Sequence, residues 1–318
     1  AGSDDVVAID RKTGFAKWHA KGVGKEPGGL LLDTARRQMY VLTVTGQEIV
    51  TLDERSGKPV SRVKFTRDPT PEKVARGRYL FGTATDKRLT KDQWVSCASC
   101  HPFGEADGRQ WNLGLGPQDT SSLRGSLESA PLHVIADIDE IQDLYHLARM
   151  RMGGQWFVPR EAMNDYLGKS NAGLDGDLDA LAAYVASLKV KKTAEPPRGS
   201  RERITKGKRI FSSAKANCVK CHSGPRYTDS GTRQSDGTYL LHDVGTWLPT
   251  EGKRLKYLDT PSLLGLRRTE PYLHDGRAKT VEEIFSVYNQ KDQHGRTSHL
   301  SPEEIEDLAE FLRYLRPD

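Results

Sequence analysis

Short apolar runs alternate with turn-forming residues in the first part of the chain. The runs are rich in β-branched residues, and Gly, Asp and Thr lie between them, a pattern typical of strands joined by tight turns. They are Val6–Asp10, Met39–Val44, Glu48–Leu52 and Val60–Phe65. We therefore expect residues 1–66 to form a small antiparallel β segment.

One motif repeats within this segment. Residues 9–14 and 52–57 both read aliphatic-Asp-x-x-Thr/Ser-Gly, and the spacing resembles the blades of a β-propeller of the YVTN or quinoprotein-like type. Only one and a half blades fit here, whereas a propeller needs at least about four. A propeller remnant would imply a longer full-length protein. The alternative is a plain antiparallel sheet, which we favour for this chain.

From residue 70 onward the apolar spacing changes to that of amphipathic helices. The predicted helices are 74–81, 178–188, 204–211 and 305–315, and the first two resemble the last two. Ser301 followed by Pro302 predicts a capped start for the last helix. The chain thus repeats, and the basic, Pro-rich stretch between the halves is typical of a linker.

All four cysteines lie in two copies of the motif Cys-x-x-Cys-His, one in each half. They are Cys97, Cys100 and His101, then Cys218, Cys221 and His222. This motif attaches c-type haem: the two thiols bond the haem vinyl groups and the His binds the iron. We therefore expect two covalently bound haem c groups, haem 1 on the first motif and haem 2 on the second.

Zinc binding, thiol redox chemistry and disulfide formation fit these cysteines less well. A zinc site would have to gather ligands from two distant motifs and would not need a His after each pair. A thioredoxin-like pair would not be duplicated with the same trailing His, and disulfides would not account for the His either.

Composition narrows the class of protein. Of 318 residues, 36% are hydrophobic and 29% charged, and no apolar stretch of about 18 residues could span a bilayer. The net charge of +5 is too small to indicate nucleic-acid binding. The 30 Gly and 16 Pro predict many loops. The fold expected is mainly α: two tandem cytochrome c-type domains at 70–192 and 198–318, preceded by the β segment.

The two-haem arrangement resembles the bacterial di-haem cytochrome c peroxidase and MauG family over residues 70–318. Beyond the haem motifs, the strongest marker is the stretch 260–277, which contains Thr-Pro-Ser-Leu and Pro-Tyr-Leu-His-Asp-Gly-Arg. In the family, the residue fourteen positions past that His is the distal ligand of the C-terminal haem, Met in the peroxidases and Tyr in MauG. The resemblance implies Tyr288 as this ligand, although Tyr288 could equally be a core tyrosine. Arg277 has the forked donors that suit a haem propionate.

The resemblance also concerns haem 1, which in this family reacts with peroxide. In resting peroxidases a His blocks its iron, eight residues before an Asn that helps to bind calcium. The stretch 116–120 resembles that loop, so Asp119 takes the calcium-ligand position and Trp111 takes the place of the blocking His. This implies an open haem 1, with Trp111 as a packing residue or a lid.

Reaction with peroxide also needs a proton carrier. His133 stands where the family has a Trp between its haems, and His133 and His146 are the nearest candidates for proton transfer. Each could instead be structural. Met150 or Met152 could also ligate haem 1 and make it a closed electron carrier.

Two functions follow. The first is a hydrogen-peroxide-dependent di-haem oxidoreductase, in which haem 1 reacts with peroxide and haem 2 transfers electrons. Its redox partner would be a small cytochrome, a cupredoxin or a protein substrate. The second is a non-enzymatic di-haem electron-transfer cytochrome. Because c-type haem is attached outside the cytoplasm, we expect a periplasmic or otherwise exported protein. The opening residues show no signal peptide, which suggests a mature or trimmed form.

Overall fold

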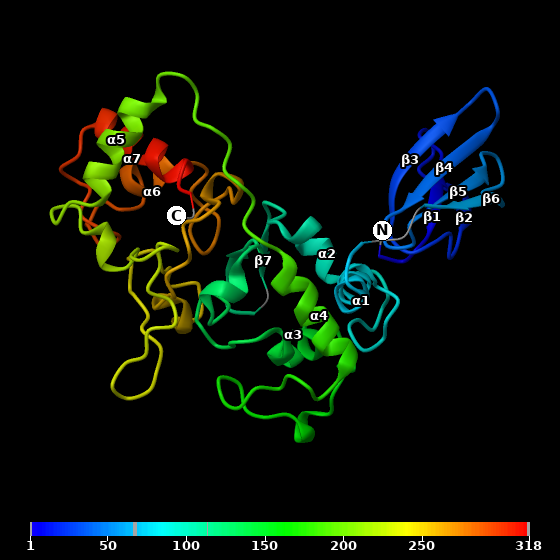
Figure 1. Ribbon diagram of the computed structural model, residues 1–318, viewed down its shortest axis with the longest axis horizontal. Helices are drawn as coiled ribbons and strands as arrows, with labels where there is room; N and C mark the ends of the chain where they lie inside the picture. The colour runs from blue at the N-terminus through cyan, green and yellow to red at the C-terminus, as the bar shows by residue number, and fades with distance from the viewer. Residues whose placement is uncertain (1, 66–68, 113, 317–318) are drawn as a thin grey trace. The chain divides into compact units, whose positions relative to one another are not determined.

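The computed structural model describes residues 2–65, 69–112 and 114–316 (Figure 1). The chain divides into two compact units. Unit 1 comprises residues 1–102, 141–165 and 170–187, and unit 2 comprises 103–140, 166–169 and 188–318. In the described ranges, no helix is long and apolar enough to cross a membrane. The domain boundaries expected from the sequence stay predictions.

The N-terminal part of unit 1 is antiparallel β structure, as expected. Strands β1 (Val6–Ile9) and β2 (Ala16–Ala20) form a hairpin. A four-stranded meander follows, in the order β3 (Pro27–Asp33), β4 (Gln38–Thr43), β5 (Glu48–Asp53) and β6 (Pro59–Lys64). The side chains of Val41, Val50 and Leu52 are fully buried in a small core of their own. Strands β2 and β3 were not predicted.

The helical part of unit 1 contains α1 (Glu72–Gly82), α2 (Cys97–Cys100), α3 (Tyr145–Met150) and α4 (Gly176–Ser187). Helices α1 and α4 confirm two of the four predicted amphipathic helices. They pack on each other, with the rings of Phe81 and Tyr184 5.1 Å apart between centroids. Leu80 of α1 and Leu178 of α4 are fully buried.

Unit 2 contains the hairpin of β7 (Gln110–Asn112) and β8 (Pro117–Asp119), and helices α5 (Ser200–Phe211), α6 (Val281–Ser286) and α7 (Pro302–Arg313). Helix α7 begins as predicted. The Ser301 hydroxyl accepts a hydrogen bond from the Glu304 amide, and the Glu304 carboxylate accepts one from the Ser301 amide. This reciprocal cap satisfies two backbone donors that a helix start otherwise leaves free.

Each unit has one helix crossing in which a glycine touches the partner backbone. A Cβ placed on Gly77 of α1 would lie 1.8 Å from the Ala180 carbonyl oxygen of α4. A Cβ placed on Gly207 of α5 would lie 2.0 Å from the Asp307 carbonyl oxygen of α7. Both helix pairs therefore approach more closely than any larger residue allows, and the two halves share this packing.

The crossing gives the first prediction. Gly207→Ala should lower the free energy of unfolding of the haem-loaded protein by about 1–3 kcal/mol, because the methyl group forces α5 and α7 apart. Thermal denaturation followed by circular dichroism measures this. Gly176→Ala is the matched control, since nothing lies within 4 Å of a Cβ there. Equal melting temperatures for the two variants would contradict the close crossing.

The expected fold class needs one correction. Only 28% of the chain is helical, so the fold is not mainly α in extent, although the predicted helices are present. Long irregular segments, which the many Gly and Pro residues favour, lie between the helices. Where the structure describes them, these segments contain short 3-10 turns and no long helices.

Candidate haem-binding sites

The two Cys-x-x-Cys-His motifs adopt the same hydrogen-bonded turn. In unit 1 the His101 amide donates to the Cys97 carbonyl at 2.8 Å, and in unit 2 the His222 amide donates to the Cys218 carbonyl at 3.0 Å. The first motif forms α2 and the second a 3-10 turn, Cys218–Lys220. Residues three apart on such a turn are neighbours, so each turn brings its two sulfurs together.

The cysteines do not have the properties of redox thiols. All four lie in the described ranges and none forms a disulfide. Burial raises the pKa of Cys97 and of Cys218 to about 11, so both thiols are neutral at physiological pH, whereas redox thiols work as thiolates. Within the part of the chain that the structure describes, no group of potential metal ligands combines the two motifs.

The His of the second motif is prepared to bind iron. Its Nδ1 donates to the Tyr227 carbonyl at 3.0 Å, which leaves Nε2 as the atom free to coordinate. Burial lowers the pKa of His222, so the ring is neutral as a metal ligand must be. The donor set of Cys218, Cys221 and His222 therefore fits a covalently attached haem.

A second imidazole lies opposite this His. The ring centroid of His294 is 6.2 Å from that of His222, with 39° between the ring planes. Burial, followed by the charge of His222, lowers the pKa of His294 to about 4. His294 was not predicted, because a lone His in a polar loop carries no motif.

Tyr288, the ligand that the family resemblance implies, follows the end of α6. Its hydroxyl donates to the Arg277 carbonyl at 3.1 Å, and the Arg277 guanidinium lies 5.9 Å from the centroid of its ring. The side chain is half-buried. Its role as an iron ligand stays a prediction.

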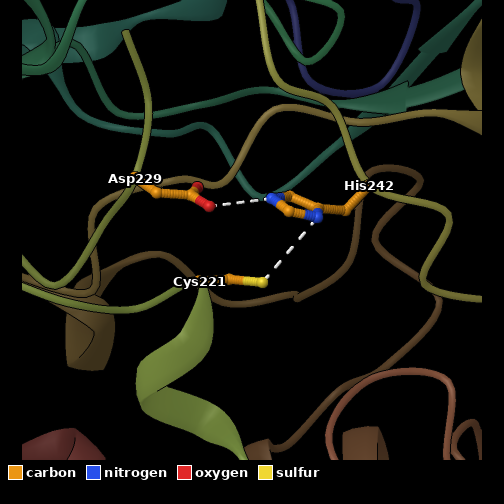
Figure 2. A group of neighbouring side chains, drawn as sticks. All are labelled: Cys221, Asp229 and His242. Atoms are coloured by element: carbon orange, nitrogen blue, oxygen red, sulfur yellow. Dashed lines mark hydrogen bonds and ion pairs between the residues drawn. The ribbon is translucent and has the colours of Figure 1, made fainter. Parts of the chain in front are cut away.

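His242 approaches the sulfur of the second motif (Figure 2). Its Nδ1 lies 3.8 Å from Cys221 Sγ, and its Nε2 lies 2.8 Å from Asp229 Oδ2. In this order the three groups resemble the nucleophile, base and acid of a hydrolase. However, Cys221 belongs to the haem motif, whose thiols are expected to bond the haem vinyl groups. His242 and Asp229 therefore lie beside the second Cys-x-x-Cys-His motif.

A buried charged cluster surrounds Arg277. Its Nε lies 2.5 Å from Asp275 Oδ2, while His274 Nε2 lies 3.2 Å from Glu251 Oε2. The side chains of Glu251 and His274 are each 1% exposed. Arg277 Nη2 lies 3.6 Å from Glu251 Oε1, too far for a hydrogen bond, so this donor is available to an anionic group such as a propionate.

Trp111 and Asp119 lie on the β7–β8 hairpin of unit 2. Trp111 Nε1 donates to Asp107 Oδ2 at 3.0 Å, which fixes the indole. Asp119 Oδ1 is buried and has no hydrogen-bond partner among the described atoms. Burial, together with the charges of Asp107 and Asp275, raises the pKa of Asp119 to about 7.

The two candidate proton carriers differ in their surroundings. His133, in unit 2, is exposed, and its Nδ1 lies 2.7 Å from Asp137 Oδ1. Its backbone has φ 65°, a left-handed conformation that is uncommon for a residue other than Gly. His146, in unit 1, lies on the exposed face of α3. His133 alone of the two has a carboxylate that orients its ring among the interactions described.

Several known proteins are similar to this chain over most of its length. No family model matches the chain. MauG from Methylorubrum extorquens is 30% identical over 86% of this chain and 86% of its own length. The gamma subunit of hydrazine synthase from Kuenenia stuttgartiensis is 28% identical over 85% of this chain and 86% of its own. Cytochrome c551 peroxidase from Nitrosomonas europaea is 23% identical over 83% and 85%.

Solved structures show the same fold. A structure of Kuenenia stuttgartiensis hydrazine synthase under xenon pressure has a TM-score of 0.59 at 24% identity, over 78% of this chain and 89% of that one. A MauG-like protein associated with microbial copper homeostasis has a TM-score of 0.54 at 20% identity, over 80% and 91%. No comparison confirms a β-propeller remnant in residues 1–66.

The paired haem motifs and the shared fold define a c-type cytochrome that works as an oxidoreductase. Within that class, the chain belongs to the family of MauG and the di-haem cytochrome c peroxidases. The family resemblance of residues 70–318 is thereby confirmed, and haem c is the cofactor.

Proposed function

We propose that the chain binds two haem c groups covalently and that the two haems have different roles. Haem 1, on Cys97, Cys100 and His101, reacts with hydrogen peroxide. Haem 2, on the second motif, accepts and supplies electrons. The observation that supports this is the same hydrogen-bonded turn in both motifs, in a chain 30% identical to MauG over most of its length.

Several side chains would serve the haems. When bound, the haems supply the redox chemistry with peroxide. His101 and His222 hold the two irons, and Arg277 offers Nη2 to a propionate. Asp137 holds the ring of His133, which would serve as a proton carrier. Trp111, tied to Asp107, fills the place of the family's blocking His as a packing residue or a lid.

We further propose a calcium ion at Asp119. Its Oδ1 is buried without a hydrogen-bond partner among the described atoms, and the carboxylates of Asp107 and Asp275 are near enough to raise its pKa. Carboxylate and carbonyl oxygens are the ligands that calcium prefers. A divalent cation would relieve the repulsion among these three acidic groups.

The redox partner is a small cytochrome, a cupredoxin or a protein substrate, and the protein works in the periplasm or otherwise outside the cytoplasm. The cellular location follows from the thioether-bound haems, because such attachment takes place on the exported chain. The partner class follows from the family, in which haem 2 exchanges electrons with another protein.

Peroxide titration tests the proposed function. Adding one equivalent of hydrogen peroxide to the oxidised di-haem protein should change the absorption of one haem at once, and a reduced donor should then be oxidised catalytically. Stopped-flow absorption measures both steps. Two haems that keep their spectra in excess peroxide would instead identify a simple electron carrier.

A further inference from the structure

The separation of His222 and His294 matches two imidazoles bound to one metal atom. A metal–imidazole bond is about 2.0 Å and a ring nitrogen lies about 1.1 Å from its centroid, so imidazoles on opposite sides of one metal have centroids about 6.2 Å apart. The observed distance is 6.2 Å. The two rings are tilted by 39° and not stacked face to face, and no hydrogen bond joins them among the described interactions.

Each of the two rings has a nitrogen for which no hydrogen bond is described, and such a nitrogen can coordinate a metal. His222 uses Nδ1 to bond the Tyr227 carbonyl. His294 has its Nδ1 buried, and this atom has no hydrogen-bond partner among the described atoms. A buried polar nitrogen without a partner costs free energy, and a metal bond to that nitrogen would offset this cost. The residue as a whole is half-buried.

The loop that carries His294 is fixed by buried hydrogen bonds. Asn289, which is 2% exposed, donates through Nδ2 to the carbonyls of His294 and Gly295, both at 2.9 Å. Its Oδ1 accepts from the His294 amide at 2.8 Å. One buried side chain thus holds the backbone of His294 on both sides and presets its position.

The same loop is attached to the haem motif itself. The Arg296 amide donates to the Ala216 carbonyl at 2.8 Å, two residues before Cys218. A Cβ on Gly295 would lie 3.8 Å from Cys218 Sγ. The loop therefore keeps His294 in register with the segment that carries the attached haem.

We propose that His294, through a ring nitrogen, is the sixth ligand of the haem 2 iron, in place of Tyr288. The Tyr288 hydroxyl already donates to the Arg277 carbonyl, whereas His294 faces His222 at the distance that one iron requires. This assignment rests on the proposed haem at His222, but it does not depend on peroxide turnover. Haem 2 is then held by two neutral imidazoles instead of an imidazole and a phenolate.

The test is the spin state of the oxidised di-haem protein without peroxide. His294→Ala should convert one low-spin haem to high spin in the ferric absorption and paramagnetic resonance spectra. Added imidazole should restore the low-spin signal. After reduction, the same haem should newly bind carbon monoxide. Tyr288→Phe and His299→Ala, an exposed His of the same loop, should each leave the spectra unchanged.

His294→Met gives an independent measurement if the Ala variant fails to retain both haems. Methionine can still ligate the iron, so haem 2 should stay low-spin while its reduction potential rises, because a Met ligand raises the potential of a His-ligated haem. Unchanged spectra and potential in His294→Met, or a spin change in Tyr288→Phe alone, would overturn the assignment. If the parent protein shows the low-spin signal of haem 2 and loses it in His294→Ala, but does not react with peroxide, the proposed function fails and the ligand assignment stands.

Discussion

A chain in which Cys97 and Cys100 are both replaced by alanine should carry one covalent haem instead of two and should no longer react with hydrogen peroxide. The thioethers hold the haem at its motif, and without them His101 alone must retain it against dissociation. Mass spectrometry of the intact protein counts the attached haems. Stopped-flow absorption measures the reaction with peroxide.

The reciprocal variant is the control. Replacing Cys218 and Cys221 should also remove one haem, but the remaining haem should still react with peroxide while turnover with an electron donor stops. His101→Gly keeps the thioethers and should regain peroxide reactivity when imidazole is added. If the second double variant loses the peroxide reaction and the first retains it, the roles of the two haems must be exchanged.

The second large effect concerns proton transfer. His133→Gln should slow the reaction of the protein with peroxide by about 10²–10⁴-fold, the range that general acid–base catalysis contributes. Asp137→Asn should have a smaller effect in the same direction, because the ring remains but loses the carboxylate that orients it. The second-order rate constant with peroxide, measured across pH, gives both values.

His146→Gln is the matched control, since His146 is also exposed but lies on α3 without a described carboxylate partner of this kind. Its rate constant should stay within about twofold of the parent. A loss in His146→Gln with a normal rate in His133→Gln would reverse the assignment. Equal rates in all three variants would mean that solvent supplies the proton.

The sequence predicted the elements whose pattern is local. Helices α1, α4, α5 and α7 follow from apolar spacing along one face, and the cap of α7 follows from Ser301 and Pro302. Strand β2 was missed because its sequence, Ala-Lys-Trp-His-Ala, is short and mostly exposed. Strand β3 was missed because two glycines follow its first residue.

The residues of the candidate site were likewise predicted where their pattern is local and missed where it is not. The motifs at 97–101 and 218–222 are contiguous and could be read directly. The position of His294 opposite His222 depends on Asn289 and on a backbone bond to Ala216, which are tertiary contacts without a sequence signature. The burial of Glu251 against His274 likewise joins residues from distant segments. Such contacts follow from the fold and not from any local pattern.

The glycine crossing of α5 with α7 has a consequence for the order of assembly. It joins residue 207 to residue 307, so unit 2 cannot close until almost all of its chain has been synthesised. Cys218 and Cys221 emerge long before α7. We therefore expect the enzymes that attach haem to meet the second motif on an open chain, and the late docking of α7 to enclose a haem that is already bound.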